Sequence, residues 1–268
     1  MQFLIDVGNT RLKWARLVRG KLTHLGSATH RDSLDRALAS LSAALPADVG
    51  RMLVANVAGD EIARRLVELA RTHSGVVPEL IATSAEAFGV HCAYSDPSRL
   101  GVDRWLGVLA AHRLIAGGLT AGAVAAGAAC VIGAGTAVTF DAVDAHGRHL
   151  GGLIFAGARL AAAALDVQTS NIGATAPAGA RPAGLDLLGK STDAAVGNGA
   201  MLALAAALDR AVAAVDAALG ARSKVYLTGG DGPQLRGWLE TETELRADLV
   251  LEGLTLFAAR PAGAAERT

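Results

Sequence analysis

The feature that most constrains the fold is a pattern that occurs in both halves of the chain. Residues 2–7 have the composition of a buried strand ending in a Gly-Asn turn, and residues 129–133 form a similar strand ending in glycines. In each half two further strand patterns follow, and helices and strands then alternate. This alternation predicts two related domains with mixed sheets covered by helices, facing each other across a cleft.

Each half is expected to begin with three strands in a meander. For the first half we expect strands at 2–7, 12–18, 21–27, 52–56 and 76–82, with helices at 32–45 and 59–73. For the second half we expect strands at 129–133, 136–143, 149–155, 224–230 and 248–253, with helices at 157–168, 193–219, 233–240 and at the C-terminus. The fold class is therefore α/β, with domains at 1–118 and 119–268, and 174–184 is expected to be an exposed loop.

Length, charge and cysteine content exclude several classes of protein. The 268 residues suffice for one large domain or two modest ones with a buried core. Lys+Arg and Asp+Glu balance at 25 each, and no dense Lys/Arg run occurs, so no nucleic-acid partner is expected. Cys92 and Cys130 are too few for a disulfide framework and have no metal-like spacing. Because the N-terminus also lacks a signal-peptide pattern, we predict a cytoplasmic protein.

Two apolar stretches need a separate interpretation. The span from Leu114 to Phe140 is uncharged and contains Gly118-x-x-x-Gly122, but it is mostly Ala and Gly and lacks the apolar bulk of a membrane helix. We expect a helix end, a loop and a buried strand there, and no membrane association. The Ala/Leu-rich helix at 199–219 is expected to lie in the core or at a subunit interface.

The first candidate site is the turn after the first strand, residues 6–10 (DVGNT). An Asp at the end of a strand lies at a cleft mouth, and Lys13 adds a positive charge on the next strand. Glycine lets the backbone approach a phosphate, and free N–H groups at such a turn bind anions. The alternative is an ordinary hairpin turn, where Gly-Asn is common.

The second half repeats this pattern at residues 133–141 (GAGTAVTFD). Two Gly/Thr turns in equivalent places predict two loops that hold one polyphosphate. A further Gly-rich turn, residues 227–232 (LTGGDG), either holds a nucleoside against bare backbone or is a simple strand–helix turn.

The fourth candidate site is residues 94–105 (YSDPSRLGVDRW). Pro97 and Gly101 indicate a rigid loop, and a helix is expected to begin near Asp103. An Asp at a helix start is usually an N-cap or a partner of the helix dipole. The functional alternative makes Asp103 a base for a substrate hydroxyl, with Arg104 supplying positive charge for a carboxylate or phosphate.

One motif is expected to mislead. Residues 184–191 (GLDLLGKS) match the P-loop pattern, which has to follow a strand directly. The preceding residues, 174–183 (ATAPAGARPA), cannot form a buried strand, and two adjacent leucines suit packing better than a phosphate cradle. We therefore expect that Lys190 does not serve ATP.

Taken together, these motifs and two others resemble type III pantothenate kinases. They come in that family's order and nearly fill the chain: DVGNTRLK (6–13), YxxPxxLGVDRW (94–105), GAGTAVTFD (133–141), STDAAVGNG (191–199), LTGG (227–230) and LVLEGL (249–254). Each motif alone is weak, whereas the combination of LGVDRW with the two phosphate loops is specific. The resemblance implies duplicated ribonuclease H-like (actin-like ATPase) domains, with mixed sheets flanked by helices around a nucleotide cleft.

The resemblance also implies a reaction and the residues that carry it. The reaction is ATP-dependent phosphorylation of pantothenate to 4′-phosphopantothenate, the first step of coenzyme A synthesis, in a homodimer that uses Mg²⁺. Asp103 would be the general base. ATP would be bound by Asp6, Val7, Gly8, Asn9, Thr10, Arg11, Leu12, Lys13 and Thr136, with Asp6 holding Mg²⁺ through water. Pantothenate would be bound by Tyr94, Gly101, Val102, Asp103 and Arg104, and by Thr192 of the neighbouring subunit.

The sequence departs from the family's pattern at two places. The family commonly has an Asp three residues before the second-loop Thr, and it binds a monovalent cation, K⁺ or NH₄⁺. Here that position is Gly133, so such an ion is either not bound or held by other groups. The family's I-x-P-G reads Ile154-Phe155-Ala156-Gly157, a change that loosens the loop but removes no catalytic group.

Three other functions are compatible with parts of the sequence. A non-catalytic regulatory or accessory protein of the same fold would have lost the base or the loops, whereas Asp6, Asp103 and Thr136 are present. A kinase of the same fold with another small hydroxylated substrate would share these groups, and here only the resemblance at 94–105 favours pantothenate. A P-loop kinase would depend on Lys190.

Overall fold

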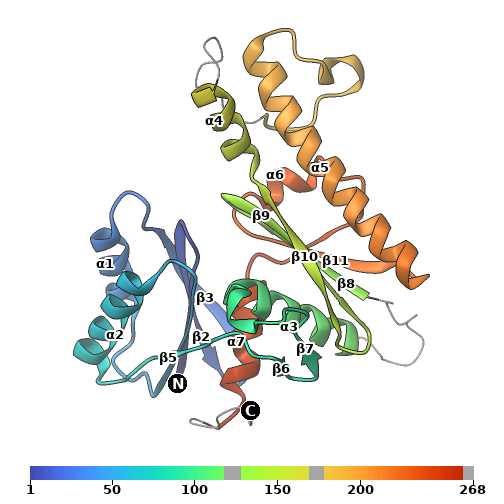
Figure 1. Ribbon diagram of the computed structural model, residues 1–268. Coiled ribbons are helices and arrows are strands. Elements are labelled where there is room, and N and C mark those ends of the chain that lie inside the picture. Colours follow the sequence, from blue (N-terminus) through green and yellow to red (C-terminus); the bar gives the residue numbers. More distant parts are fainter. Residues whose placement is uncertain (118–127, 169–177, 262–268) are drawn as a thin grey trace. The chain divides into compact units, whose positions relative to one another are not determined.

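The computed structural model describes residues 1–117, 128–168 and 178–261, and the chain forms two compact units (Figure 1). Unit 1 comprises Met1–Ala110 and Leu249–Thr268, and unit 2 comprises Ala111–Asp248. The predicted boundary between residues 118 and 119 lies outside the described residues. That prediction also assigned the end of the chain to the second domain, whereas its last helix packs within unit 1.

The sheet of unit 1 has five strands in the order β3-β2-β1-β4-β5. β1 (Gln2–Val7), β2 (Arg11–Val18) and β3 (Lys21–Thr29) form an antiparallel meander, as the sequence predicts. β4 (Arg51–Asn56) pairs in parallel with β1, and β5 (Glu79–Leu80) pairs in parallel with β4. β1 is therefore the central strand, and its C-terminal end opens into the β1–β2 turn.

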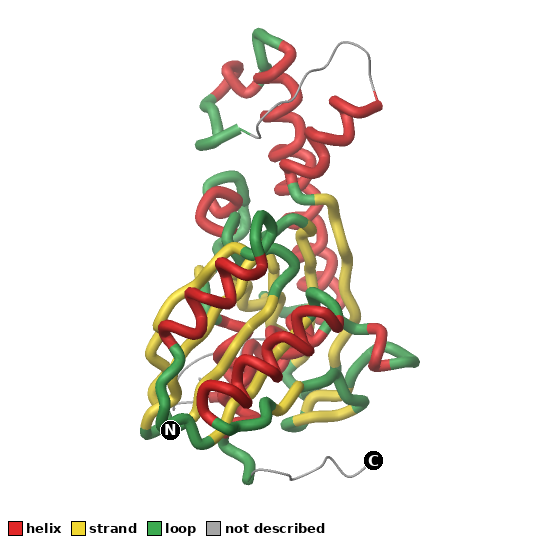
Figure 2. The backbone as a smooth tube through the Cα atoms, turned by 90° about the vertical axis from the view of Figure 1, so that its left-hand side faces the viewer, coloured by secondary structure: helices red, strands yellow, loops and turns green. Residues whose placement is uncertain are grey.

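Two helices cover one face of this sheet. Figure 2 shows α1 (Leu34–Ala44) and α2 (Asp60–Ser74) side by side over the strands. Alternate residues of β1, which point to the same face of a strand, pack with buried residues of both helices. The core of this face includes Phe3, Ile5, Val7, Leu12, Trp14, Leu38, Leu41, Ile62 and Leu66. The helix predicted at 59–73 therefore exists, and it buries Ile62 and Leu66 against the sheet.

The last helix, α7 (Leu249–Ala258), corrects one prediction. A strand was predicted at 248–253, but Leu249 begins a helix that contacts β1, β2 and β4. This segment contains a continuous apolar run of only three residues, 249–251, which is too short to distinguish a strand from a buried helix. Burial at Leu249, Gly253, Leu254 and Phe257 instead follows helical spacing.

The sheet of unit 2 repeats the order of unit 1, as β10-β9-β8-β11-β12. β8 (Ala128–Ala134), β9 (Ala137–Asp144) and β10 (His149–Ala156) form the antiparallel meander. β11 (Ser223–Thr228) is parallel to β8, and β12 (Glu244–Leu245) is parallel to β11. The predicted duplication of an α/β unit with a mixed sheet is confirmed.

The helices of unit 2 pack on this sheet. α5 (Thr192–Leu219) contacts β8, β9 and β11, α4 (Ala158–Gln168) lies against α5, and α6 (Gly232–Arg236) contacts β8, β11 and β12. The core that they form with the sheet includes Met201, Leu204, Leu208, Val212 and Leu235, together with Trp238 after α6. α5 thus lies on the core, although its neighbours α4 and β10 expose several large apolar side chains, which are described below.

Smaller elements were not predicted. β6 (Glu86–Ala87) and β7 (Val90–His91) form a hairpin, and 3₁₀ turns occur at Pro97–Arg99 and Gly184–Leu187. α3 (Val102–Gly117) begins where the sequence predicts a helix near residue 103. The Gly118-x-x-x-Gly122 spacing lies outside the described residues. Within the ranges that are described, no helix is long and apolar enough to cross a bilayer.

Candidate active site

The β1–β2 turn carries the first predicted site. In the strand register Asp6 of β1 lies opposite Lys13 of β2 and beside Ala55 of β4. Directly opposed residues of an antiparallel pair project from the same face, so a carboxylate and an ammonium group share one face of the sheet at the end of β1. Both side chains are half-buried. This strand end therefore offers a ligand for a cation and a ligand for an anion.

Backbone hydrogen bonds fix the conformation of this turn. The Gly8 N–H donates to the Arg11 carbonyl at 3.0 Å, and the His30 N–H donates to the Thr10 carbonyl at 3.0 Å. The Nε2 of His30 lies 2.7 Å from the Gly8 carbonyl oxygen. Because a carbonyl oxygen only accepts, Nε2 is the donor. The turn is thereby tied to the end of β3, so its shape is set before any ligand arrives.

Asp103 lies in the first turn of α3 and is half-buried. Its Oδ1 accepts a hydrogen bond from the Arg104 N–H at 2.8 Å. The Trp105 N–H donates to the Gly101 carbonyl at 3.0 Å, which is an early bond of the helix. The carboxylate is therefore held at the helix start, where it also interacts favourably with the helix dipole. The predicted dipole role thus fits this geometry, and it is compatible with a chemical role.

Arg104 provides a buried positive charge beside this carboxylate. The residue is 8% exposed, and its Nη1 donates to the Tyr94 hydroxyl at 3.1 Å. The guanidinium carbon lies 5.8 Å from the centroid of the Tyr94 ring. A guanidinium presents a fixed fork of N–H donors that matches the oxygens of a carboxylate or phosphate. Within the segment 94–105, the Tyr94 hydroxyl therefore contacts the Arg104 guanidinium, and the carboxylate of Asp103 contacts the Arg104 backbone.

Some of the predicted binding residues have buried side chains and could contact a ligand only through their backbone. The side chains of Val7 and Leu12 are 0% exposed, and that of Val102 is 7% exposed, so all three belong to the core of unit 1. Asn9 and Arg11 are exposed at the turn, and Thr10 is half-buried. Contacts to a ligand at Val7, Leu12 and Val102 would have to come from N–H and C=O groups.

In unit 2 the β8–β9 turn brings together two of the predicted glycine-rich segments. Thr136 is exposed at this turn, and its carbonyl accepts from the Gly157 N–H at 3.0 Å. The Asp231 N–H donates to the Ala134 carbonyl at 3.1 Å. The turn, the start of α4 and the loop after β11 therefore meet at one place. The candidate sites at 133–141 and 227–232 are parts of one site within unit 2.

Thr192 is the first residue of α5 and is exposed. The helix is capped by Ser191, whose hydroxyl accepts from the Ala194 N–H at 3.2 Å. Large apolar side chains are exposed nearby in the chain, at Leu185 and Leu188. This end of α5 is therefore open to a further partner.

The P-loop-like segment has none of the context of a P-loop. Residues 178–183 form no strand, and Gly184 begins a 3₁₀ turn. Lys190 is exposed and lies 3.3 Å from Asp186, as an i,i+4 pair on the surface. The expectation that this segment is no phosphate cradle therefore fits its structure.

The donor set at the β1–β2 turn suits magnesium bound together with phosphates. Across the described residues, no three or more His, Cys, Asp or Glu side chains are grouped to hold a metal ion. Mg²⁺ at nucleotide sites takes one or two carboxylates, and phosphate oxygens and waters complete its octahedron. The single carboxylate of Asp6, beside a turn that the sequence predicts to bind phosphate, meets that requirement.

Sequence reasoning did not name His30 and gave no role to Asp231 or Asp141, although both aspartates lie in candidate motifs. His30 supports the Gly8 carbonyl, and Asp231 anchors its loop on the Ala134 carbonyl. Asp141, the last residue of the second glycine motif, is buried and lies 3.1 Å from Nε2 of His149. No local pattern reveals such contacts, because each joins residues from different elements.

The family comparison agrees with the order of the motifs. A family model for type III pantothenate kinase matches residues 2–214. A type III pantothenate kinase from Nitrosococcus oceani is 36% identical over 258 residues, which cover 96% of this chain and 94% of that protein. A type III pantothenate kinase from Paracidovorax citrulli is 37% identical over 266 residues, with coverage of 97% and 98%. The similarity therefore extends over nearly the whole of each chain.

Two solved structures show the same fold at low sequence identity. A protein named as a 2-dehydro-3-deoxygalactonokinase from Sinorhizobium meliloti has a TM-score of 0.53 at 16% identity and covers 96% of this chain and 98% of its own. A protein named as an N-acetylmannosamine kinase from Listeria monocytogenes has a TM-score of 0.50 at 13% identity, with the same coverage. Similarity at these identities shows the fold alone, which is the actin-like ATPase fold of sugar kinases.

Proposed function

The chain belongs to the type III pantothenate kinase family, and we propose that the β1–β2 turn and the start of α3 carry its reaction. The enzyme phosphorylates pantothenate with ATP, which yields 4′-phosphopantothenate in the first step of coenzyme A biosynthesis. The observation that supports the residue assignment best is the carboxylate of Asp103, fixed at a helix start by the backbone N–H of Arg104, a residue that is itself buried. This is the arrangement needed to orient an acceptor hydroxyl next to an anionic substrate.

Asp103 is the general base of this proposal. Its carboxylate accepts the proton of the pantothenate hydroxyl while the hydroxyl oxygen forms a bond to the γ-phosphorus. The bond from that phosphorus to the β–γ bridging oxygen breaks, and ADP leaves with the electron pair. The bond from the Arg104 N–H to Oδ1 of Asp103 restricts rotation of the carboxylate. The carboxylate of Asp103 is therefore held in one orientation for accepting the proton of the attacking hydroxyl.

The phosphates are bound by the two glycine-containing turns. Around the β1–β2 turn, Lys13 supplies positive charge, and backbone N–H groups of residues 8–10 bind phosphate oxygens. Thr136 at the β8–β9 turn contacts ATP from unit 2. When bound, Mg²⁺ neutralises charge on the phosphates, and the carboxylate of Asp6 would hold it through water. In this type of reaction, positioning and charge neutralisation account for most of the rate enhancement.

Tyr94 and Arg104 bind pantothenate. The substrate carries a carboxylate, and a guanidinium that is 8% exposed gains most when it pairs with such an anion. The Tyr94 hydroxyl accepts a hydrogen bond from Nη1 of Arg104, and this bond helps to fix the orientation of the guanidinium. Gly101 and Val102 complete the site through backbone contacts.

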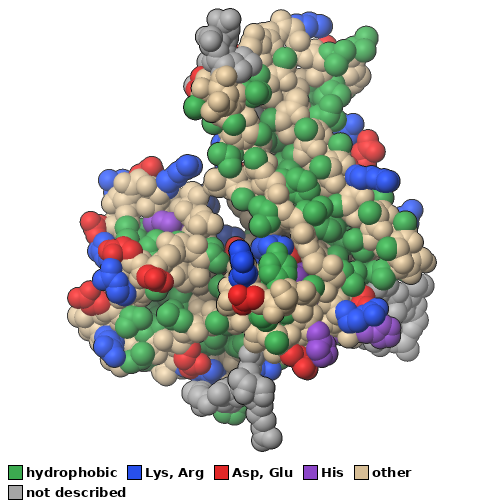
Figure 3. Space-filling model, viewed as in Figure 1, with side chains coloured by type: hydrophobic (Ala, Val, Ile, Leu, Met, Phe, Trp, Pro, Cys, Tyr) green, Lys and Arg blue, Asp and Glu red, His purple; other side chains and the backbone are tan. Residues whose placement is uncertain are grey.

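We further propose a homodimer in which Thr192 completes the pantothenate site of the partner subunit. Figure 3 shows hydrophobic side chains over the part of the surface that α4 and α5 form. Exposed large apolar residues of unit 2 include Ile154, Leu160, Leu165, Val167, Leu185, Leu188 and Leu202. An apolar surface of this kind marks an interaction site, and a second copy of this chain would cover it beside Thr192.

The substitution Asp103→Asn tests the assignment of the base. It keeps the side-chain shape and the Oδ1 acceptor but removes the basic oxygen, so kcat should fall on the order of 10²–10⁴-fold. The assay measures ATP-dependent phosphorylation of pantothenate, and circular dichroism checks the fold. Asp60→Asn is the control, because Asp60 also lies in the first turn of a helix of unit 1, α2. This change should leave kcat unchanged. A folded Asp103→Asn enzyme with wild-type turnover would remove this role from Asp103.

Subunit mixing tests the homodimer and the shared site. Asp103→Asn and Thr192→Ala subunits are each expected to have low activity alone. A mixed dimer combines one intact Asp103 with one intact Thr192, so the mixture should be more active than either parent. Leu188→Glu should produce monomers in sedimentation experiments. Dimers of the Leu188→Glu variant would contradict the proposed interface. A mixture with no more activity than its parents would contradict the shared site.

A further inference from the structure

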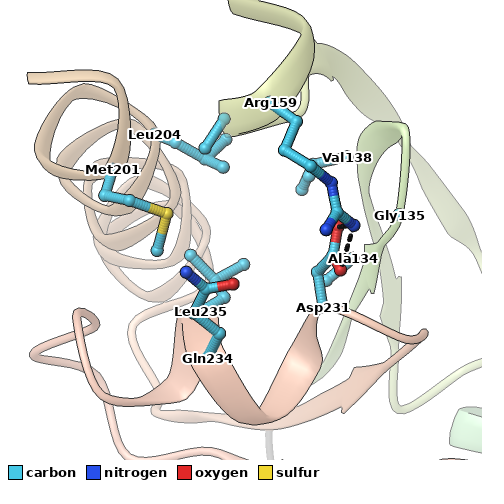
Figure 4. A pocket seen from close by; sticks show the side chains of 10 residues that line it. Ala134, Gly135, Val138, Arg159, Met201, Leu204, Asp231, Gln234 and Leu235 are labelled. Atoms are coloured by element: carbon cyan, nitrogen blue, oxygen red, sulfur yellow. Dashed lines mark hydrogen bonds and ion pairs between the residues drawn. The ribbon is translucent and has the colours of Figure 1, made fainter. Parts of the chain in front are cut away.

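A pocket within unit 2 opens beside the β8–β9 turn. Its lining includes Ala134 and Gly135 of that turn, and apolar side chains such as Val138, Met201 and Leu235 (Figure 4). Of the described residues that line it, Arg159 and Asp231 carry charge. The pocket therefore combines an apolar wall with one cation and one anion next to a turn that binds ATP in the proposed function.

Arg159 and Asp231 form an ion pair at this pocket. The Nη2 of Arg159 lies 2.6 Å from Oδ1 and 2.8 Å from Oδ2 of Asp231. Both bonds use the same nitrogen, whereas a guanidinium has five N–H donors. The three donors on Nε and Nη1 take no part in the pair. Because the Arg159 side chain is 66% exposed, these donors lie within reach of a ligand in solution.

Both members of the pair are anchored on the same turn. Arg159 lies two residues after Gly157, whose N–H donates to the Thr136 carbonyl. The backbone at Gly157 packs closely on the turn, because a Cβ there would lie 2.5 Å from the Gly135 carbonyl oxygen. On the other side, the Asp231 N–H donates to the Ala134 carbonyl at 3.1 Å. The guanidinium is therefore placed by the backbone of the turn and not only by its own side-chain rotamers.

Stability alone does not account for such a pair. Ion pairs with this degree of exposure contribute from nothing to about 1 kcal/mol, because water screens them and side-chain entropy is lost. The pair does fix the direction of a long, otherwise mobile side chain. A guanidinium matches the geometry of phosphate oxygens, and an adjoining apolar wall strengthens the interaction by lowering the local dielectric.

We propose that Arg159 is a further binding residue for the phosphates of ATP, donating from Nε and Nη1 at the β8–β9 turn, and that Asp231 is a positioning residue that holds its guanidinium. This inference rests on the proposed function, in which Thr136 of the same turn contacts ATP. Asp231 keeps its two bonds to Nη2 while the other donors face the nucleotide. The pair thus adds to the phosphate site a cation that the glycine motif itself lacks.

The test compares Arg159→Gln with the wild type. The KM for ATP should rise on the order of 10-fold, the loss expected for a charge-assisted hydrogen bond, while the KM for pantothenate stays unchanged. Arg148→Gln is the matched control, because Arg148 is 68% exposed and pairs with Asp144 at 2.7 Å elsewhere in unit 2. Its KM for ATP should equal that of the wild type. Melting temperatures confirm that each variant folds, and Arg159→Lys, which keeps the charge, should lose less affinity than Arg159→Gln.

Two inhibitors distinguish a contact between Arg159 and the phosphates of ATP from a contact with its nucleoside. Arg159→Gln should weaken inhibition by ADP and by inorganic tripolyphosphate to a similar extent. Weakened inhibition by ADP alone would assign Arg159 to the nucleoside and overturn the proposal. Unchanged inhibition by both, with Thr136→Ala impaired, would also overturn it while leaving the proposed function intact. If Thr136→Ala too has no effect, the assignment of the β8–β9 turn to ATP fails as well.

A double substitution tests the role of Asp231. Asp231→Asn should raise the KM for ATP several-fold, and in the Arg159→Gln background it should have no further effect, because a positioning residue acts through its partner. A lower KM for ATP in Asp231→Asn would mean that the carboxylate competes with the phosphates. That outcome would overturn the positioning role.

Discussion

A Cβ atom at Gly101 would lie 2.7 Å from Oδ1 of Asp103. No Cβ normally comes this close to another atom, so a side chain at residue 101 would force the carboxylate to move. The same oxygen accepts the Arg104 N–H bond. The glycine of the LGVDRW motif is therefore linked physically to the position of the proposed base.

Gly101→Ala should impair catalysis more than stability. The added methyl group displaces the Asp103 carboxylate by a few tenths of an ångström or more, and a misplaced base costs on the order of 10²-fold in kcat. Steady-state kinetics and thermal melting measure the two effects. Gly50→Ala is the control in the same unit, since a Cβ there would meet its nearest atom at an ordinary 3.7 Å. Wild-type kcat in Gly101→Ala would show that the carboxylate does not need this position.

Tyr94→Phe should weaken pantothenate binding specifically. The change removes the hydroxyl that accepts from Nη1 of Arg104 at 3.1 Å, so the buried guanidinium loses one of its orienting bonds. A lost hydrogen bond of this kind corresponds to roughly 1 kcal/mol, or about a 5-fold rise in the KM for pantothenate. The KM for ATP should be unaffected. A rise in both constants would indicate that the substitution disturbs more than the pantothenate site.

The duplicated sheets could be predicted because their signals are local. The strand at 2–7 was predicted with the bounds found for β1, and the meanders follow from short strands joined by glycine turns. The strand predicted at 76–82 is shorter, at Glu79–Leu80, and Val77 and Leu80 are 56% and 51% exposed. Apolar composition there did not correspond to burial, which depends on what packs against the segment.

The last helix could not be predicted for the same reason. Residues 249–251 are a short apolar run that a strand could also contain, but α7 packs on β1, β2 and β4 from the other end of the sequence. Contacts between such distant segments decide the conformation of a short apolar run.

Prediction of the candidate site from sequence has the same limit, because some of its contacts join distant segments. The motif at 94–105 placed Tyr94, Asp103 and Arg104 in one segment, whereas the support of Gly8 by His30 arises only in the folded chain.

The attachment of α7 to the sheet should depend on pH through Glu79. Arg51 donates to both carboxylate oxygens of Glu79 at 2.7 and 2.8 Å, and its Nη1 also donates to the Arg260 carbonyl after α7. The hydrogen bond from Arg51 holds the pKa of Glu79 below its usual 4.5. A lowered folded-state pKa means that the stabilisation is present above about pH 4.5 and is lost as the pH falls through the folded-state value.

Glu79→Gln should therefore lower stability at neutral pH by about 1 kcal/mol, a modest amount because the Glu79 side chain is 35% exposed. Urea unfolding at several pH values measures the difference from the wild type. The difference should shrink as the pH drops below 4.5. A difference that is constant down to pH 3 would mean that the ion pair does not contribute through its charge.

The activity should not require K⁺ or NH₄⁺. The family's carboxylate at this position is replaced by Gly133, which pairs with Thr139 across β8 and β9. A Cβ at Gly133 would lie 2.7 Å from the Thr139 hydroxyl oxygen, so the neighbouring strand already fills the room that a carboxylate would need. This position therefore lacks the charged oxygen that the family's pattern offers to a monovalent cation. Pantothenate phosphorylation should thus proceed at equal rates in buffers with Mg²⁺ and with or without K⁺ or NH₄⁺. Activity that appears only when one of these ions is added would contradict this prediction and would mean that other groups hold the ion.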